Sequence, residues 1–459
     1  MHKIVNKKDI PQILDVNIEK LSNLGLGIAK VDGYVIFVSG ACPGDFVKIR
    51  LSKKNKNFAN GEVIEIIEPS PHRIEPFCKM QKVCGACQLQ YIDYKKQLEL
   101  KREIVQDTMK SIYGSEITVK EVVPSPKNKE YRHKLQYPIS ETKESKRIVA
   151  GYYKQNSHEI VNIKYCPIQP EYCDKIIEFI RIAAKECYVS GYLEKEHKGL
   201  LRHVIIRTSA FNKKSLVVLV INSKSTPQEI KKLAGRIYNE LENICGVVVN
   251  FNDKKTNLIS GEKTETLEGT DFVEEKLCDK IFKIGAKTFF QINPFCANNI
   301  FEYVKQYISS NFNAPSILDA YAGISTFGIC LSDIASKVVT VEEVEESVIL
   351  AKKIIEENSI KNIEACCMDA GKFLEQLAKK NEKFDITVLD PPRKGCSQES
   401  LDYALKLTKK AIIYISCNPA TLARDLKYLK EKGAKISSVQ PFDMFPHTYH
   451  IESAVFIEL

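Results

Sequence analysis

Five short apolar runs follow one another between residues 316 and 419: SILDAY (316–321), KVVTVEE (337–343), IEACCMD (363–369), FDITVLDPP (384–392) and AIIYISCNP (411–419). The segments between these runs read as helical stretches. Strands that alternate with helices are typical of a doubly wound parallel sheet. We therefore expect residues 281–459 to form an α/β domain of the Rossmann-like type, closed by two last strands within 435–445 and 450–459.

The chain before this domain needs folding units of its own, because 459 residues are too many for a single core. Short alternating strands punctuated by glycines predict a small β-barrel over residues 8–68. Alternating β-rich segments predict a central domain over residues 69–92 and 113–280, built on an antiparallel sheet with some helix. Residues 93–112 read as one amphipathic helix.

The composition is that of an ordinary globular protein, with 44% hydrophobic and 27% charged residues. The N-terminal MHKIVNKKDIPQ lacks the apolar core of a signal peptide, and no run is long enough to span a bilayer. We expect a cytoplasmic, monomeric protein with no membrane and no obligate protein partner. The net charge of +9 is compatible with RNA, and equally with simple solubility.

Acidic residues end three successive strands of the predicted sheet, at Glu342, Asp369 and Asp390. One such residue would favour a helix N-cap, whereas a set on one rim favours a ligand site. Glu342 lies at the offset beyond Asp319 that suits ribose hydroxyls, and Asp369 suits an adenine amino group. The glycine-rich pyrophosphate fingerprint of NAD and FAD sites is absent. S-adenosylmethionine, which has no phosphates, fits better.

Cys417 stands where the strand 411–416 gives way to a helix, at the ligand edge of the sheet. A helix N-terminus is expected to lower the pKa of such a thiol. A thiolate that adds to C6 of uracil makes C5 nucleophilic toward a methyl group, and a base must then remove the C5 proton. The segment FPHTYHIES (445–453) offers Glu452 as that base, with His447 in reserve.

At this point the sequence resembles a known family. AKTFFQINP (286–294), LDAYAGIS (318–325), LDPPRKG (389–395), YISCNP (414–419) and HIES (450–453) are similar, in order, to the signature blocks of RNA uracil-C5 methyltransferases. CPGDFV (42–47) and GEVIEIIEPSPHR (61–73) extend the resemblance to the N-terminal region. The closest branch is the 23S ribosomal RNA enzymes with a TRAM domain and an iron–sulfur cluster.

The resemblance implies roles for single residues. Gln291, Tyr321, Glu342 and Asp390 fall at cofactor positions, Cys417 at the nucleophile and Glu452 at the general base. It implies that the barrel is an RNA-binding TRAM domain and that the helix 93–112 packs on the catalytic domain. The loop at 321–327 departs from the family pattern, because it lacks a cysteine and a second glycine, which leaves the local cofactor contacts less defined.

Three cysteines lie in one loop, at Cys78, Cys84 and Cys87, and Cys166 in YCPIQ is the best fourth ligand. Four thiolates suit zinc or an iron–sulfur cluster, and the spacing does not decide between them. The resemblance favours a [4Fe–4S] cluster with a structural or RNA-positioning role, because Cys417 explains the chemistry without radicals.

The barrel and the cysteines together resemble the ribosomal RNA branch of the family, which implies 23S ribosomal RNA as the target, with transfer RNA uridine-54 as the alternative. A cytosine-C5 methyltransferase is disfavoured because no cysteine adjoins the double proline 391–392. A non-catalytic iron–sulfur RNA-binding protein is disfavoured by Cys417 and Glu452. Arg132, Lys134 and Arg393 could contact RNA phosphates, although ordinary surface charge explains such residues equally well.

Overall fold

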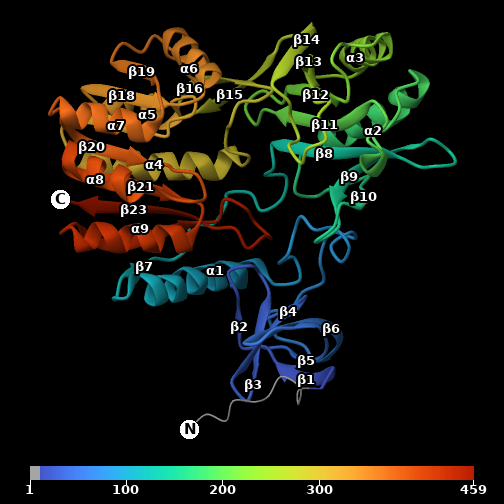
Figure 1. The fold of residues 1–459 in the computed structure, drawn as a ribbon, viewed down its shortest axis with the longest axis horizontal. Coiled ribbons are helices and arrows are strands. Elements are labelled where there is room, and N and C mark those ends of the chain that lie inside the picture. Colours follow the sequence, from blue (N-terminus) through green and yellow to red (C-terminus); the bar gives the residue numbers. More distant parts are fainter. Residues whose placement is uncertain (1–10) are drawn as a thin grey trace.

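A computed structural model describes residues 11–459. Residues 1–10 lie outside the described part. They include the first positions of the predicted barrel (8–10) and most of the N-terminal segment that we expect not to be a signal peptide. The described chain forms three regions, and one helix, α1 (Tyr94–Thr108), lies between the N-terminal and the C-terminal of them (Figure 1). No helix among residues 11–459 is long and apolar enough to cross a membrane.

The N-terminal region is a six-stranded sheet that curls around a core of its own. Its order is β1-β5-β6-β4-β3-β2. Alternation of apolar and polar residues turns every second side chain of each strand inward, and Ile36, Val38, Val47, Ile49 and Leu51 form the centre of the core. The strands are β1 (Ile13–Asn17), β2 (Lys20–Leu21), β3 (Gly27–Val31), β4 (Tyr34–Ser39), β5 (Phe46–Lys54) and β6 (Phe58–Glu68).

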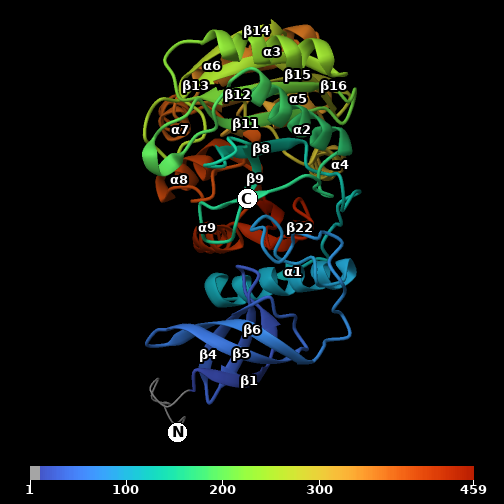
Figure 2. The ribbon, with the colours of Figure 1, turned by 90° about the vertical axis from the view of Figure 1, so that its right-hand side faces the viewer.

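Helix α1 (Tyr94–Thr108) follows the cysteine-bearing loop and ends in a π-helical turn at Met109–Tyr113. The Asp93 side chain caps it by accepting the Lys96 N–H at 3.0 Å. In both orthogonal views α1 lies between the barrel and helix α9 (Pro419–Glu431) (Figures 1 and 2). The helix expected over 93–112 is therefore present, with its last turn widened into a π-helical turn.

The central region is a seven-stranded sheet of order β10-β9-β8-β11-β12-β13-β14, with α2 and α3 packed against it. β12 and β13 pair in parallel. The expected antiparallel sheet is thus wrong at this pair, because α3 makes a crossover between the two strands. The elements are β8 (Lys134–Glu141), β9 (Ile148–Tyr153), β10 (Ile160–Asn162), α2 (Glu171–Glu186), a 3-10 turn (Glu194–Glu196), β11 (Leu201–Thr208), β12 (Ser215–Ile221), α3 (Gln228–Glu240), β13 (Ile244–Phe251) and β14 (Lys263–Gly269).

The C-terminal region confirms the predicted Rossmann-like sheet, of order β19-β18-β17-β20-β21-β23-β22-β7. Strands β17 to β21 are parallel, and β23 runs antiparallel to β21. The elements are β7 (Thr118–Val119), α4 (Pro294–Asn311), β17 (Ser316–Ala320), α5 (Thr326–Leu331), a 3-10 turn (Ser332–Ile334), β18 (Lys337–Glu342), α6 (Glu345–Glu357), β19 (Ile363–Cys367), α7 (Ala370–Lys379), β20 (Phe384–Leu389), α8 (Gln398–Leu407), β21 (Thr408–Ser416), α9, β22 (Lys435–Phe442) and β23 (Glu452–Glu458).

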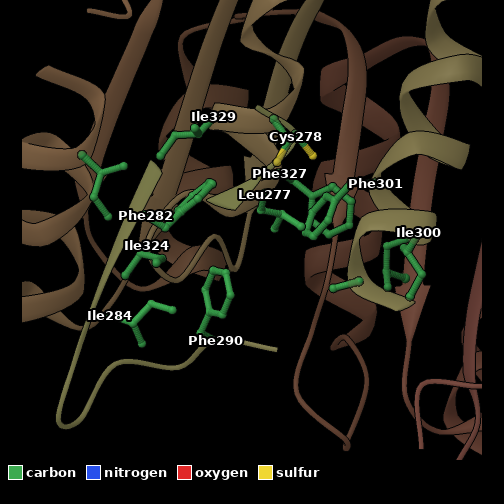
Figure 3. Close-up of a cluster of buried hydrophobic side chains, with 14 of the residues drawn as sticks. Leu277, Cys278, Phe282, Ile284, Phe290, Ile300, Phe301, Ile324, Phe327 and Ile329 are labelled. Carbon is green, nitrogen blue, oxygen red and sulfur yellow. The ribbon is translucent and has the colours of Figure 1, made fainter. Parts of the chain in front are cut away.

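A hairpin of β15 (Phe272–Leu277) and β16 (Lys280–Gly285) joins the central and C-terminal regions. Figure 3 shows its buried side chains beside Phe290 and Ile324. The rings of Phe282 and Phe290 lie 5.7 Å apart between centroids. Phe290 is therefore fixed in the core, which holds the neighbouring Gln291 next to the loop that follows β17.

A buried ion pair ties α1 to the loop between β22 and β23. The side chains of Lys101 and Asp443 are both 0% exposed, and Lys101 Nζ lies 2.5 Å from Asp443 Oδ1. The same ammonium donates to the carbonyls of Phe445 (3.1 Å) and His450 (3.0 Å). All three of its protons are thus used within the segment 443–450.

We expect Lys101→Met to lower the free energy of unfolding by about 3–5 kcal/mol, because it leaves the Asp443 carboxylate buried without its partner. The matched control is Lys20→Met, which removes the exposed Lys20–Asp107 ion pair (57% and 55% exposed) and should cost less than about 1 kcal/mol. Urea unfolding followed by circular dichroism measures both. Equal destabilisation of the two variants would contradict the importance given to the buried pair.

Candidate active site

A cavity of about 560 Å³ opens at the carboxyl rim of the C-terminal sheet. Residues from the ends of several strands, from the segment before α4 and from the β22–β23 loop converge on it. Every catalytic and cofactor residue expected from the sequence lines this one cavity: Gln291, Tyr321, Glu342, Asp369, Asp390, Cys417 and Glu452. A single space can therefore hold both a cofactor and a reacting base.

Strand register brings the expected nucleophile and base together. Ser416 at the end of β21 pairs with Ser453 near the start of β23 in an antiparallel ladder. Extended by one position beyond this last pair, the same register places Cys417 opposite Glu452, and the two side chains are close enough for the charge of Glu452 to raise the pKa of the thiol. Two residues far apart in sequence thus meet because the last strand returns antiparallel beside β21.

The pKa of Cys417 is raised to about 11, which overturns the expectation of a lowered value. Burial is the main cause, the charges of Glu452 and Asp390 add to it, and Arg393 opposes it. The helix gives little help, because Asn418 is the N-cap of α9 and its side chain accepts the Ala420 N–H at 3.1 Å. Cys417 therefore precedes the cap and lies outside the first turn.

Two carboxyl groups beside Cys417 hold their protons more tightly than usual. Burial raises the pKa of Asp390 to about 7. Burial also raises the pKa of Glu452 well above its ordinary value, with Asp390 adding to the rise and Arg393 opposing it. A positive charge that entered this space would lower the pKa of both carboxyls and of the thiol.

The loop after β17 forms the cofactor side of the cavity. Tyr321 and Gly323 have φ of 65° and 56°, so the chain turns back sharply at the strand end. Glu342 holds this turn, since its carboxylate accepts the N–H groups of Gly323 (2.9 Å) and Val344 (3.0 Å). Asp369 both lines the cavity and caps α7 through the Lys372 N–H at 3.0 Å.

Asp319 is a site residue to which the sequence reasoning assigned no role. It lines the cavity, is 1% exposed, and its Oδ1 is buried without a hydrogen-bond partner among the described residues. Burial raises the pKa of Asp319 to about 8. Its place at a strand end was the available signal. Phe445 and His450 also line the cavity; the sequence offered His450 as one candidate of the segment 445–453 without giving it a role, and nothing pointed to Phe445.

His447, the reserve base, is wrong for that role. Its Nε2 lies 2.8 Å from the Asn128 carbonyl and its Nδ1 lies 3.2 Å from Gln97 Nε2. The ring is buried and is not among the residues that line the cavity. His447 instead connects the loop to α1 through Gln97, so Glu452 is the better candidate for the base.

The three residues expected to contact RNA phosphates do not share a site. Arg393 lines the active-site cavity, Arg132 lines a second cavity near the barrel, and Lys134 lines a third beside the loop 252–263. Burial lowers the pKa of Lys134 to about 7, and Arg207 and Arg132 add to the effect. Lys134 is therefore a poor surface cation, whereas Arg393 acts on Cys417 and Glu452 directly.

The four candidate metal ligands are neighbours. The pKa of Cys87 is raised to about 12 by burial, with Cys84 and Cys78 adding to the rise, and the pKa of Cys166 is raised by burial and by Cys87. Four such thiols have the chemistry of an iron–sulfur or zinc donor set. Within residues 11–459, however, no three or more Cys, His, Asp or Glu side chains are arranged to hold a metal ion.

Comparison with known proteins agrees with this geometry. Residues 93–459 match the family described as tRNA (uracil-5-)-methyltransferase, and residues 8–64 match the TRAM domain. The chain belongs to the tRNA (uracil-5-)-methyltransferase family. Two relatives, from Clostridium tetani (37% identical over 453 residues) and Halalkalibacterium halodurans (36% over 456), are each called an uncharacterized RNA methyltransferase. These matches span 98% and 99% of this chain, and 98% of each relative.

One solved structure is similar over almost the whole length of this family member. It is the Pyrococcus abyssi tRNA (uracil-54, C5)-methyltransferase in complex with S-adenosyl-L-homocysteine, with a TM-score of 0.76 and 26% identity over 97% of this chain and 100% of that one. The chain is thus an S-adenosylmethionine-dependent RNA uracil-5-methyltransferase with an N-terminal TRAM domain.

The buried carboxyls predict that cofactor binding depends on pH. Below their pKa values of about 8 and 7, Asp319 and Asp390 are neutral and cannot attract the sulfonium cation. Affinity for S-adenosylmethionine should therefore weaken as pH falls from about 7 to about 5.5, by up to about tenfold per unit for each coupled carboxyl. Calorimetric titration measures this over a range in which the ligand amino group stays protonated.

S-adenosylhomocysteine is the matched ligand control, because its sulfur is uncharged. Its affinity should change much less over the same range, and Asp390→Asn should flatten the profile of S-adenosylmethionine. Parallel pH profiles for the two ligands would show that the carboxyls do not sense the sulfonium charge.

Proposed function

We propose that this enzyme methylates C5 of a uridine through a covalent adduct of Cys417, with Glu452 as the base that completes the reaction. The observation that carries the proposal is that Cys417 and Glu452, at the adjoining ends of the paired strands β21 and β23, line one cavity with the expected cofactor residues. The cofactor S-adenosylmethionine supplies an electrophilic methyl group when it is bound.

The first step belongs to Cys417. Arg393 lowers the pKa of this thiol, and a cationic sulfonium held near Asp390 acts in the same direction. The thiolate adds to C6 of the uracil, the C5=C6 double bond opens, and the electron pair on C5 forms a bond to the methyl group. The C–S bond of the methyl donor breaks and its pair stays on the departing sulfur.

The second step belongs to Glu452. Its carboxylate takes the proton from C5, the C5=C6 double bond re-forms, and the thiolate of Cys417 leaves C6. Burial gives this carboxyl a high proton affinity, which suits a base that must hold the proton until the product departs. Phe445 and His450, which line the same cavity, offer aromatic faces to the uracil.

On the cofactor side, Glu342 and Asp369 would receive the ribose hydroxyls and the adenine amino group, and Gln291 and Tyr321 would contact the cofactor directly. Their convergence on one cavity supports these roles. Asp319 adds an unpartnered carboxylate oxygen that fits a cationic or hydrogen-bond-donating group. The target uridine must leave any helix to reach this depth.

The proposed RNA is 23S ribosomal RNA, supported by the TRAM domain together with the four cysteines, a combination that resembles the ribosomal RNA branch. Transfer RNA is the second candidate, and the similarity to the Pyrococcus abyssi tRNA (uracil-54, C5)-methyltransferase favours it. Arg132 and Arg393 are proposed to contact the RNA, and Lys134 is the weakest of the three because its pKa is lowered by burial.

We also propose that Cys78, Cys84, Cys87 and Cys166 hold a [4Fe–4S] cluster, with zinc as the alternative. Their shared neighbourhood supports it, and closing the site would require the thiols to move together and lose their protons. The role would be structural, because the segment that carries them hydrogen-bonds the active-site loop through the Leu89 N–H and the His447 carbonyl at 2.9 Å.

The decisive experiment incubates the protein with labelled S-adenosylmethionine and with unmodified ribosomal or transfer RNA, and then identifies the labelled nucleoside. We expect 5-methyluridine from ribosomal RNA. The same nucleoside from transfer RNA alone would move the substrate to the second candidate, and 5-methylcytidine or no label from either RNA would overturn the proposal.

Two variants test the mechanism in the same assay. Cys417→Ala should lose all methylation and form no adduct, and Glu452→Gln should accumulate a protein–RNA adduct that survives denaturing electrophoresis, because the C5 proton cannot leave. Cys245→Ala, which removes another half-buried cysteine, is the control and should behave as wild type. Full activity of Cys417→Ala would exclude covalent catalysis by this residue.

Metal content is measured on protein purified without oxygen. We expect iron and acid-labile sulfide in equal amounts, lost in Cys166→Ser and kept in Cys173→Ser, which changes a buried cysteine of the same region. Zinc without sulfide would favour the alternative, and the absence of both from folded wild-type protein would refute a metal site.

A further inference from the structure

A second cavity lies directly beside the active site and is unused by the proposed chemistry. Its volume is about 570 Å³, close to that of the active-site cavity. Its walls come from three parts of the chain: the barrel loop at Leu24 and Leu26, the cysteine-bearing segment at Gln88, and the central domain at Arg132 and Tyr153. Tyr449 of the β22–β23 loop completes it.

Two consecutive residues link the two cavities. Tyr449 lines the second cavity and His450 lines the active site. Their rings lie 4.4 Å apart between centroids. If an RNA strand places one base against His450, the adjacent nucleotide of that strand can therefore reach Tyr449.

The lining of the second cavity suits a nucleobase. Tyr449 and Tyr153 provide aromatic faces, and stacking on such faces is how proteins hold single-stranded bases. Arg132 adds a guanidinium that pairs with no carboxylate among the described residues; it lies over the Tyr152 ring at 5.1 Å. No Asp or Glu lines the cavity, so nothing there repels a phosphate.

Gln88 adds a hydrogen-bond acceptor to the lining of the second cavity. Its Nε2 donates to the Gly85 carbonyl at 2.7 Å, which fixes the amide, and its Oε1 is buried without a partner among residues 11–459. An unpaired buried acceptor is costly and is relieved by a donor. Adenine, cytosine and guanine carry an amino group that could donate, whereas uracil carries none.

We propose that this second cavity binds the base of a nucleotide adjacent to the target uridine, and that Gln88 selects a base with an exocyclic amino group. The inference rests on the proposed placement of the target uracil beside Cys417. The added subsite lies at the junction of the barrel, the cysteine-bearing segment and the catalytic loop. It would recognise the RNA sequence around the target uridine.

The test measures RNA binding as well as turnover, so that the subsite and the chemistry are judged separately. The RNA is a short single-stranded oligonucleotide cut from the substrate around the methylated uridine, or around any bound uridine if none is methylated. Removing the base at each flanking position in turn should weaken binding to wild type about 5- to 100-fold at one position next to the uridine.

Tyr449→Ala should weaken binding of the intact oligonucleotide by a similar factor and should make the enzyme indifferent to the missing base at that position, because both changes delete the same contact. Tyr449→Phe keeps the ring and should bind as wild type. Tyr188→Ala removes a tyrosine that is 87% exposed elsewhere and is the control. S-adenosylhomocysteine affinity should be unchanged in all three variants, which shows that the neighbouring cavity is intact.

Gln88→Leu tests the base preference. Two oligonucleotides are compared that carry adenine or purine, which lacks the amino group, at the flanking position where removal of the base weakens binding. Wild type should bind the adenine oligonucleotide more tightly, and Gln88→Leu should abolish the difference. Two results would overturn the subsite even if methylation occurs. In the first, the fold-losses in affinity caused by Tyr449→Ala and by the missing base multiply, as they would for independent contacts. In the second, wild type binds equally well whichever flanking base is removed. If the two losses in affinity do not multiply but no 5-methyluridine is formed, the subsite is supported and the proposed function is overturned.

Discussion

The ammonium of Lys101 lies where no solvent reaches it, and the active-site loop is built around that charge. The segment from Asp443 to His450 has no strand partner to hold it. It is held instead by Lys101, by the Tyr94 hydroxyl, which donates to the Asp443 carboxylate at 2.8 Å, and by Gln97, which accepts the His447 N–H at 3.1 Å. All three side chains come from α1. The helix that separates the barrel from the catalytic region thus also shapes the loop that lines the active-site cavity.

The opposite wall of the site depends on regular structure. Parallel strands that end on one rim present Asp319, Glu342 and Asp390 to the same space, and this follows from topology alone. The antiparallel return of β23 adds Glu452 opposite Cys417. The cofactor side is therefore fixed by backbone hydrogen bonds of the sheet, whereas the RNA side is fixed by side chains from outside it.

This division explains what the sequence could reveal. Strand ends are readable from alternating apolar runs, so Glu342, Asp369, Asp390 and Cys417 could be placed on one rim from the sequence alone. Lys101 could not, because its partner lies 342 residues away and an amphipathic pattern treats a lysine as an exposed residue. Local rules also gave the wrong direction for the pKa of Cys417, since burial and the neighbouring carboxyls outweigh the helix end.

The buried carboxyl groups of the cavity lower the stability of the folded protein. Asp319, Asp390 and Glu452 are buried close together, and burial raises the pKa of each, so the empty site favours neutral carboxyls. Buried acids oppose folding unless a base offsets their burial, and Arg393 does so in part for Glu452. Under the proposed function, a cationic methyl donor would supply positive charge beside these acids. In the proposed reaction the sulfur loses its positive charge with the methyl group, so these carboxyls would hold the thioether product less strongly than the methyl donor.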